Sequence, residues 1–91
     1  MNKQELVSQV SENSGLTKVD AEKAIDATIH AITHSLKAGD EVRLVGFGTF
    51  TTAERKQTEG RNPRTGEKIN IPATRLPKFR AGKQLKDSVA L

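Results

Sequence analysis

The chain has 91 residues, enough for one domain, but only 34% are hydrophobic, which is too little for a generous core in a single copy. It has no cysteine, no run of about 18 apolar residues and no apolar N-terminal signal region, so we expect no disulfide, no cysteine-based metal site and no membrane partner. Residues 1–45 carry five basic and seven acidic side chains, whereas residues 46–91 carry ten basic and four acidic ones, which favours a polyanionic partner for the second half.

Two helices are predicted in the first half of the chain. An amphipathic pattern over residues 2–14 predicts a short first helix, and Gly15 stands where a helix commonly ends. A second helix is predicted over residues 18–38, with Thr17 as its N-cap and Asp20 in the capping-box position. We therefore expect residues 1–45 to be mainly helical.

The predicted second helix has more apolar surface than one chain can cover. It carries a broad apolar stripe, and a face of small residues lies beside that stripe. A helix with so much apolar circumference is buried on more than one side, and the short first helix cannot cover both. The sequence therefore predicts a homodimer, in which a second copy covers the remainder. The two faces consist of Ala21, Ile25, Thr28, Ile29, Ile32 and Leu36, and of Ala24, Ala27 and Ala31.

Strands are predicted in the second half. Residues 41–45 alternate between polar and apolar, and the sequence Gly-Phe-Gly at 46–48 indicates a sharp bend. Residues 51–59 contain no large apolar side chain, so this limb must project into solvent or onto a ligand. In the return limb, Pro72 indicates an edge strand or a bulge, and a final short helix is predicted from Gly82.

Between the two limbs lies the sequence Gly-Arg-Asn-Pro-Arg-Thr-Gly, at residues 60–66. Its glycines, asparagine and proline predict a tight loop that joins two extended limbs into a β-hairpin. Arg61 and Arg64 flank the rigid ring of Pro63, a combination that suits a nucleic-acid groove, because Arg neutralises phosphates and Pro can wedge between base pairs. The alternatives are an ordinary turn proline and edge charges that prevent aggregation.

These residues resemble the bacterial histone-like DNA-binding proteins of the HU/IHF family. The resemblance covers the whole chain and rests on residues 46–50, Arg55, the 60–66 loop and residues 71–74 and 82–86. It implies one α+β domain over residues 1–91, made of a mainly helical dimerisation part (1–45), a sheet and β-arm (46–81) and a C-terminal helix (82–91). It further implies an intertwined homodimer with a helical base and two protruding β-ribbon arms.

The resemblance also implies a function. Family members embrace duplex DNA through its minor groove, and a proline at each arm tip wedges between base pairs. We therefore expect an architectural protein without enzymatic activity, cofactor or metal, which bends DNA with little sequence specificity and helps to compact and protect it in the bacterial nucleoid, in the cytoplasm. The DNA-binding residues implied are Arg55, Arg61, Asn62, Pro63, Arg64, Lys83 and Lys86.

The arm departs from the HU pattern at several positions. HU arms commonly carry Arg at the positions held here by Ala53 and Thr58, and Glu54 and Glu59 dilute the charge further. This predicts lower affinity, or greater reliance on body residues such as Arg80.

The three aromatic residues, Phe47, Phe50 and Phe79, have two interpretations. They could form a base-stacking platform for single strands, but stacking aromatics would sit among basic side chains on the arm. We favour a role in the core and the dimer interface.

A metal site and an enzyme are both disfavoured. His30 and His34 are four residues apart, with Asp26 one turn earlier, a spacing that can bind metal. No fourth ligand is apparent and the helix is expected to be largely buried, so no metal site is predicted. The chain offers no cysteine nucleophile, no recognisable nucleophile–base pair and no phosphate-cradling glycine motif. A protein-interaction module and an RNA or single-strand binder that uses the basic hairpin stay open as alternatives.

Overall fold

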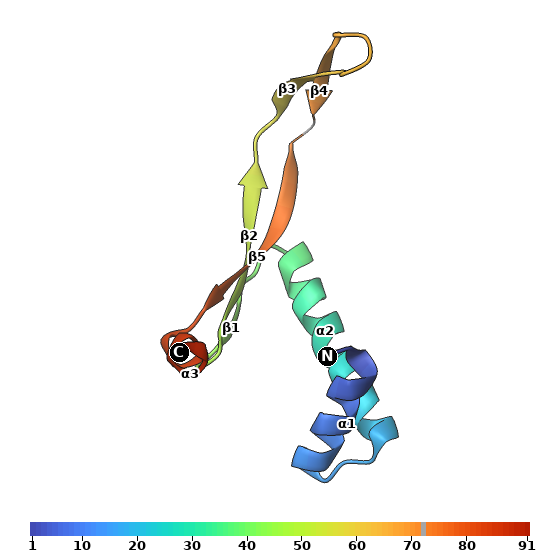
Figure 1. The fold of residues 1–91 in the computed structure, drawn as a ribbon, viewed down its shortest axis with the longest axis vertical. Coiled ribbons are helices and arrows are strands. Elements are labelled where there is room, and N and C mark those ends of the chain that lie inside the picture. The colour runs from blue at the N-terminus through green and yellow to red at the C-terminus, as the bar shows by residue number, and fades with distance from the viewer. Residues whose placement is uncertain (72) are drawn as a thin grey trace.

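The computed structural model describes residues 1–71 and 73–91, with the backbone alone at positions 58, 70 and 71 (Figure 1). The prediction for Pro72 lies outside these residues. The described elements confirm the α+β class. In chain order they are α1 (Lys3–Ser14), α2 (Lys18–Lys37), β1 (Val42–Leu44), β2 (Gly48–Arg55), β3 (Thr58–Arg61), β4 (Lys68–Ile71), β5 (Thr74–Ala81) and α3 (Lys83–Val89).

Local capping explains where the first two helices begin and end. The side chain of Asn2 accepts a hydrogen bond from the backbone N–H of Glu5 at 2.9 Å, which caps α1, and Gly15 ends that helix. The hydroxyl of Thr17 accepts a hydrogen bond from the backbone N–H of Asp20 at 3.1 Å, as predicted for the start of α2. Both predicted helices are confirmed to within one residue at each end.

The strands form an antiparallel sheet that narrows into a ribbon. The sheet has the order β1-β2-β5, but β1 pairs with β2 only as far as Phe50, so beyond that point β2 has β5 alone as a neighbour. Strands β3 and β4 prolong this two-stranded ribbon in unchanged register, because two residues on each strand separate the Arg55–Thr74 pair from the Thr58–Ile71 pair. The ribbon projects from the body as an arm (Figure 1), which confirms the predicted projection.

Strand β1 is shorter than the predicted strand at residues 41–45. The chain turns at residues 45–47, where the backbone N–H of Phe47 donates a hydrogen bond to the carbonyl of Leu44 at 2.9 Å. This turn brings β2 back beside β1 and ends the pairing at Leu44 and Gly48.

The two faces of the three-stranded sheet differ in chemistry. Residues directly opposite one another in antiparallel strands share a face, and successive residues alternate between faces. Phe50 lies opposite Phe79, and Thr52 lies opposite Pro77. Thr52 and Pro77 also line a hollow together with Leu36 of α2, so we call this side of the sheet the helix-facing side. The opposite side is called the outer face.

An aromatic cluster occupies the helix-facing side. The ring of Phe79 lies 4.8 Å from that of Phe50 and 5.4 Å from that of Phe47, measured between centroids. Gly48 permits this approach, because a Cβ atom there would come within 2.5 Å of the Phe79 ring. Leu76 lies on the outer face, because it is one position out of phase with Pro77 and Phe79 along β5.

One chain alone has almost no core. Among the described residues, Val7 and Ala21 are the only buried apolar side chains, while Ile29 remains 55% exposed and Phe47 45% exposed. The accessible surface is 7724 Å², against about 5200 Å² expected for a compact monomer of 9.9 kDa. The radius of gyration is 18.8 Å, against about 12 Å expected. The prediction that α2 has more apolar surface than one chain covers is therefore confirmed.

Candidate nucleic-acid interface

The tip of the arm is a single helical turn, shorter than the seven-residue loop predicted. Gly60 and Arg61 belong to β3, because they find backbone partners in Ile69 and Lys68 of β4. The turn therefore spans only residues 62–67. The backbone N–H of Asn62 donates to the carbonyl of Glu67 at 2.8 Å, and the N–H of Gly66 donates to the carbonyl of Asn62 at 2.8 Å.

The order of residues explains this turn. Asn62 acts as an N-cap, since its side-chain Oδ1 accepts a hydrogen bond from the backbone N–H of Arg64 at 2.9 Å. Pro63 follows at the first helical position, where a missing N–H costs nothing. Gly66 ends the turn with φ of 70°, a left-handed conformation that glycine adopts without strain. The local sequence thus encodes a defined tip.

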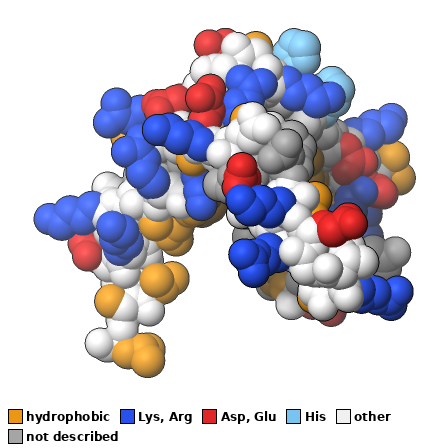
Figure 2. All heavy atoms as spheres, turned by 90° about the horizontal axis from the view of Figure 1, so that it is seen from above, with side chains coloured by type: hydrophobic (Ala, Val, Ile, Leu, Met, Phe, Trp, Pro, Cys, Tyr) orange, Lys and Arg blue, Asp and Glu red, His pale blue; other side chains and the backbone are white. Residues whose placement is uncertain are grey.

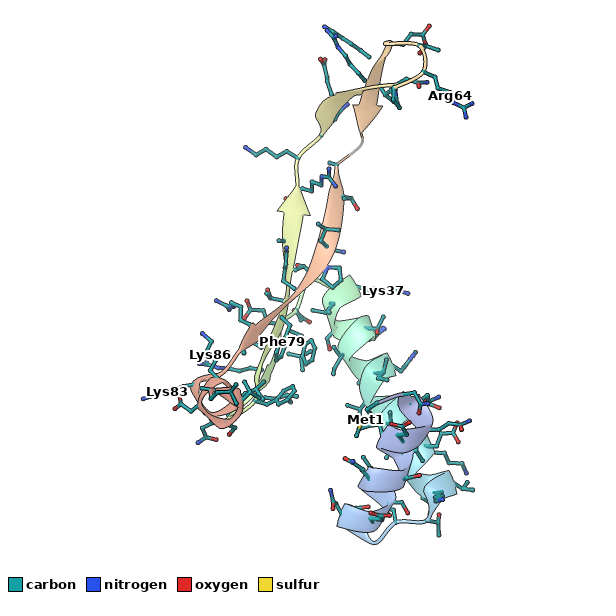
Figure 3. The ribbon with its side chains drawn as sticks, in the orientation of Figure 1. Met1, Lys37, Arg64, Phe79, Lys83 and Lys86 are labelled. Atoms are coloured by element: carbon teal, nitrogen blue, oxygen red, sulfur yellow. The ribbon has the colours of Figure 1, made fainter. Side chains whose placement is uncertain are left out.

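The predicted tip residues are brought together at the end of the arm. Pro63 and Arg64 are exposed, Arg61 is exposed at the end of β3, and Asn62 is half-buried. Figure 3 shows Arg64 extending from the tip into solvent. The arm therefore presents a rigid apolar ring between two cationic side chains, far from the helices at the other end of the molecule (Figure 1).

The outer face of the sheet forms a second cationic surface. Arg43 and Arg80 lie on either side of Thr49 across the three strands, and Lys78 and Arg55 lie on the same face nearer the arm. All four basic side chains are exposed. We call Arg43, Arg55, Lys78 and Arg80 the outer-face cations.

Helix α3 extends this surface. A hollow of about 590 Å³ lies between the sheet and the start of α3, and its lining includes Arg43, Arg80 and Lys86. Lys83 projects from another side of α3, away from the sheet (Figure 3). Seen from above the arm, Lys and Arg side chains gather over the part of the molecule that carries α3 and the end of the sheet (Figure 2).

One acidic side chain moderates this charge. The Oε1 atom of Glu41 lies 3.8 Å from Nη2 of Arg80 and accepts a hydrogen bond from the hydroxyl of Thr51 at 3.1 Å. Because both partners of the ion pair are more than half exposed, its energy is small and phosphate can compete for Arg80.

The sequence interpretation missed Arg43 and Lys78. Both lie in segments expected to be extended, but which face they occupy depends on the pairing of β1, β2 and β5. Successive side chains of a strand alternate between the two faces of the sheet. With the correct pairing of the three strands, this alternation would have placed Arg43 and Lys78 on the same face as Arg80. Arg75, in contrast, lies on the helix-facing side, where its guanidinium bonds to the carbonyl of Lys37.

The aromatic cluster lies on the side of the sheet opposite the outer-face cations. Phe47, Phe50 and Phe79 are therefore not interleaved with the cations, as a single-strand stacking platform would require. Their partial exposure leaves an apolar surface on the helix-facing side.

The histidine pair lies at the surface (Figure 2). The rings of His30 and His34 stack 6.4 Å apart, and both residues are exposed in the single chain. In this chain α2 packs on α1 and also contacts β1 and β2. The large burial expected for this helix requires a second copy and stays a prediction. Asp26 is paired with Lys3 at 2.8 Å. In the described part of the chain, no group of three or more potential metal-binding side chains is present.

None of the helices in the described ranges combines the length and the hydropathy needed to cross a membrane.

Comparison with known proteins places these features in a family context. The sequence model of a family described as "Bacterial DNA-binding protein" matches residues 1–90. DNA-binding protein HU of Geobacillus stearothermophilus is 54% identical over 89 residues, which cover 98% of this chain and 99% of that protein. The HU protein of Clostridium pasteurianum is 57% identical over 89 residues, with 98% of both chains covered.

Solved structures agree with the sequence relatives. The fold matches that of Anabaena HU in a cocrystal with DNA, with a TM-score of 0.92 at 50% identity, covering 99% of this chain and 98% of that one. HU from Thermotoga maritima matches with a TM-score of 0.70 at 31% identity, covering 99% of this chain and all of that one.

Proposed function

Because the chain belongs to the bacterial DNA-binding protein family, and is an HU-type histone-like DNA-binding protein and not an enzyme, we propose that it works as a homodimer that bends duplex DNA with little sequence preference. One observation carries this proposal above the others: Pro63 and Arg64 stand exposed at the tip of an arm that continues from a cationic sheet face. The two surfaces can engage the same duplex.

The arm tip supplies the bending step. A proline ring inserted from the minor groove unstacks a base step at a cost of a few kcal/mol, which the contacts of a bent duplex recover. Arg61 and Arg64 would bind phosphates on either side of that step. Arg side chains in the minor groove distinguish A·T from G·C pairs only weakly, so little base specificity results.

The body supplies electrostatic binding. The hollow of about 590 Å³ brings Arg43, Arg80 and Lys86 together where they can bind backbone phosphates, and Lys83 adds a further cation on another side of α3. Phosphate contacts position a duplex but carry no sequence information. Because Ala53, Glu54 and Glu59 leave the arm less basic, the body carries a larger share of the binding energy.

The exposed apolar surface supports an intertwined homodimer. The α2 stripe and the aromatic cluster are only partly covered, and the chain, its projecting arm included, exposes roughly 2500 Å² more than a compact monomer would. A second copy would cover the helix-facing side and present two arms to one duplex. Repeated bending of this kind would compact and protect DNA in the bacterial nucleoid, in the cytoplasm.

A titration at several salt concentrations tests this function. The full chain is mixed with random-sequence duplexes that are intact, nicked or joined as a four-way junction. Affinity should fall steeply and linearly on a log–log salt plot. Nicked and junction DNA should bind more tightly than intact DNA, because they have less stacking to lose. Salt-independent binding, or equal affinity for all three, would contradict the proposal.

The same titration, extended to single-stranded DNA and to RNA, decides between this function and its alternatives. Tighter binding to single-stranded DNA or RNA than to every duplex would favour a single-strand or RNA binder. The absence of nucleic-acid binding at low salt would favour a protein-interaction module.

A further inference from the structure

We propose that Asn62 is a positioning residue, which holds the wedge in its working geometry from inside the turn. This inference rests on the proposed bending function, since it concerns how the same arm tip is shaped. It assigns to Asn62 a task different from that of Pro63 and Arg64, which meet the DNA.

The hydrogen bonds of Asn62 are directed inward. Its Oδ1 accepts from the N–H of Arg64 at 2.9 Å, its carbonyl accepts from the N–H of Gly66 at 2.8 Å, and its own N–H donates to Glu67 at 2.8 Å. Three of its four polar groups are therefore committed to the turn, and only Nδ2 is left over from these bonds. Asn62 is also half-buried, whereas Pro63 and Arg64 are exposed.

These bonds fix the direction of the proline ring. Proline has a fixed φ, and the residue before a proline is restricted to extended conformations, so the ring direction depends on the few torsions around Asn62. The hydrogen bond from the N–H of Arg64 to Oδ1 of Asn62 restricts those torsions, because it joins the residues on either side of Pro63. Without this hydrogen bond, the N–H of Arg64 would bond to water and the tip would populate other conformations.

The size of the effect follows from the population of the competent shape. A net hydrogen bond of this kind changes a conformational equilibrium about fivefold. The apparent affinity for the bent complex is the intrinsic affinity multiplied by the fraction of tips that already hold the shape needed for bending. Electrostatic binding through the outer-face cations needs no defined tip and should be unaffected.

Three variants separate positioning from contact. Asn62→Ala removes the acceptor, whereas Asn62→Ser keeps a hydroxyl that can form the same turn more weakly. Thr65→Val is the matched control, because it removes the other side-chain acceptor of this turn, a bond of 3.3 Å from the N–H of Glu67 that does not span Pro63.

The test uses the full chain and a short duplex labelled at both ends. Energy transfer between the ends reports bending, a salt titration reports phosphate contacts, and amide hydrogen exchange at Arg64 reports the turn in the free protein. For Asn62→Ala we expect exchange at Arg64 to speed up by up to about fivefold and affinity for intact duplex to fall by at most about fivefold, with a smaller loss on nicked DNA and an unchanged salt slope. Asn62→Ser should recover most of this loss, and Thr65→Val should resemble the unmodified protein.

Two results would overturn the positioning role. Unchanged bending and affinity in Asn62→Ala would show that the acceptor is dispensable, and equal losses in the Ala and Ser variants would indicate a direct contact. Pro63→Ala, measured in parallel, separates this inference from the proposed function. If Pro63→Ala leaves bending unchanged, the wedge itself is wrong and the inference falls with it. If Pro63→Ala abolishes bending but Asn62→Ala changes neither bending nor affinity, only the role of Asn62 is rejected.

Discussion

Nη2 of Arg75 donates a hydrogen bond to the backbone carbonyl of Lys37 at 3.0 Å, and so joins the strand that leads into the arm to the last residue of α2. The final carbonyls of a helix have no partner within the helix and carry a partial negative charge. A guanidinium is therefore well suited to this position. Because this bond uses the charge of Arg75 on the helix-facing side, we assign Arg75 to the fold and not to DNA.

Arg75→Gln should lower the free energy of unfolding by about 1 kcal/mol, because it removes a charged donor from an exposed helix end. Denaturant unfolding measures this loss. Lys78→Gln is the matched control, since Lys78 lies on the same strand but on the outer face. The control should keep its stability and lose part of its salt-dependent DNA binding, and the opposite pattern in the two variants would disprove the assignment of faces.

Assembly should show in the dependence of stability on protein concentration. If two chains jointly bury the α2 stripe and the aromatic cluster, the unfolding midpoint rises with concentration, because dimerisation stabilises the folded state by mass action. Thermal unfolding at several concentrations, paired with sedimentation, measures this. A midpoint that does not change, together with a monomeric mass, would contradict the dimer.

The cations of α3 should act through phosphates alone. Lys83→Ala and Lys86→Ala should each weaken binding to all duplexes about equally and reduce the salt slope by roughly one unit for each phosphate that the variant no longer neutralises. Lys23→Ala serves as the control, because Lys23 is exposed on α2 in the acidic half of the chain. A lysine whose removal leaves the slope intact does not bind a phosphate.

The ion pair of Lys3 gives a prediction for alkaline pH. Lys3 lies 2.8 Å from Asp26 and 3.6 Å from Glu22, and its hydrogen bond to Asp26 and the negative charge of Asp26 raise the pKa of Lys3 above its ordinary value. A pKa raised in the folded state contributes stability that is present below the unfolded pKa and is lost as pH rises through the folded one. The melting temperature of Lys3→Gln should therefore lie slightly below that of the unmodified protein at neutral pH and converge with it in strong alkali. A difference that persists there would rule out this charge effect.

Local patterns were sufficient to predict the helices. Thr17 caps the residues that follow it, and Gly15 ends the helix before it, so both boundaries depend on neighbours in sequence. Phe47, Phe50 and Phe79 are the only aromatic residues of the chain apart from its histidines, and the structure brings their rings together.

Features that depend on strand pairing were not predictable in the same way. Gly60 and Arg61 were predicted to lie in the loop. They belong to β3 because they pair with residues of β4, which come later in the chain, and local sequence does not reveal that pairing. The outer-face position of Arg43 beside Arg80 depends on register across three strands, and the Arg75–Lys37 bond joins residues 38 positions apart. The roles of the DNA-binding residues in solution stay predictions.

Energy transfer between the ends of a short labelled duplex tests the central claim, that Pro63 bends DNA as a wedge. Pro63→Ala shortens the wedge but leaves the outer-face cations and the tip arginines in place. We predict that end-to-end distance in saturated complexes increases sharply towards that of free duplex, while affinity for intact DNA at low salt falls much less. Thermal melting of the free protein should be unchanged, since the exposed tip lies outside the body. An unchanged end-to-end distance in saturated Pro63→Ala complexes would contradict the wedge and leave Pro63 as an ordinary turn residue.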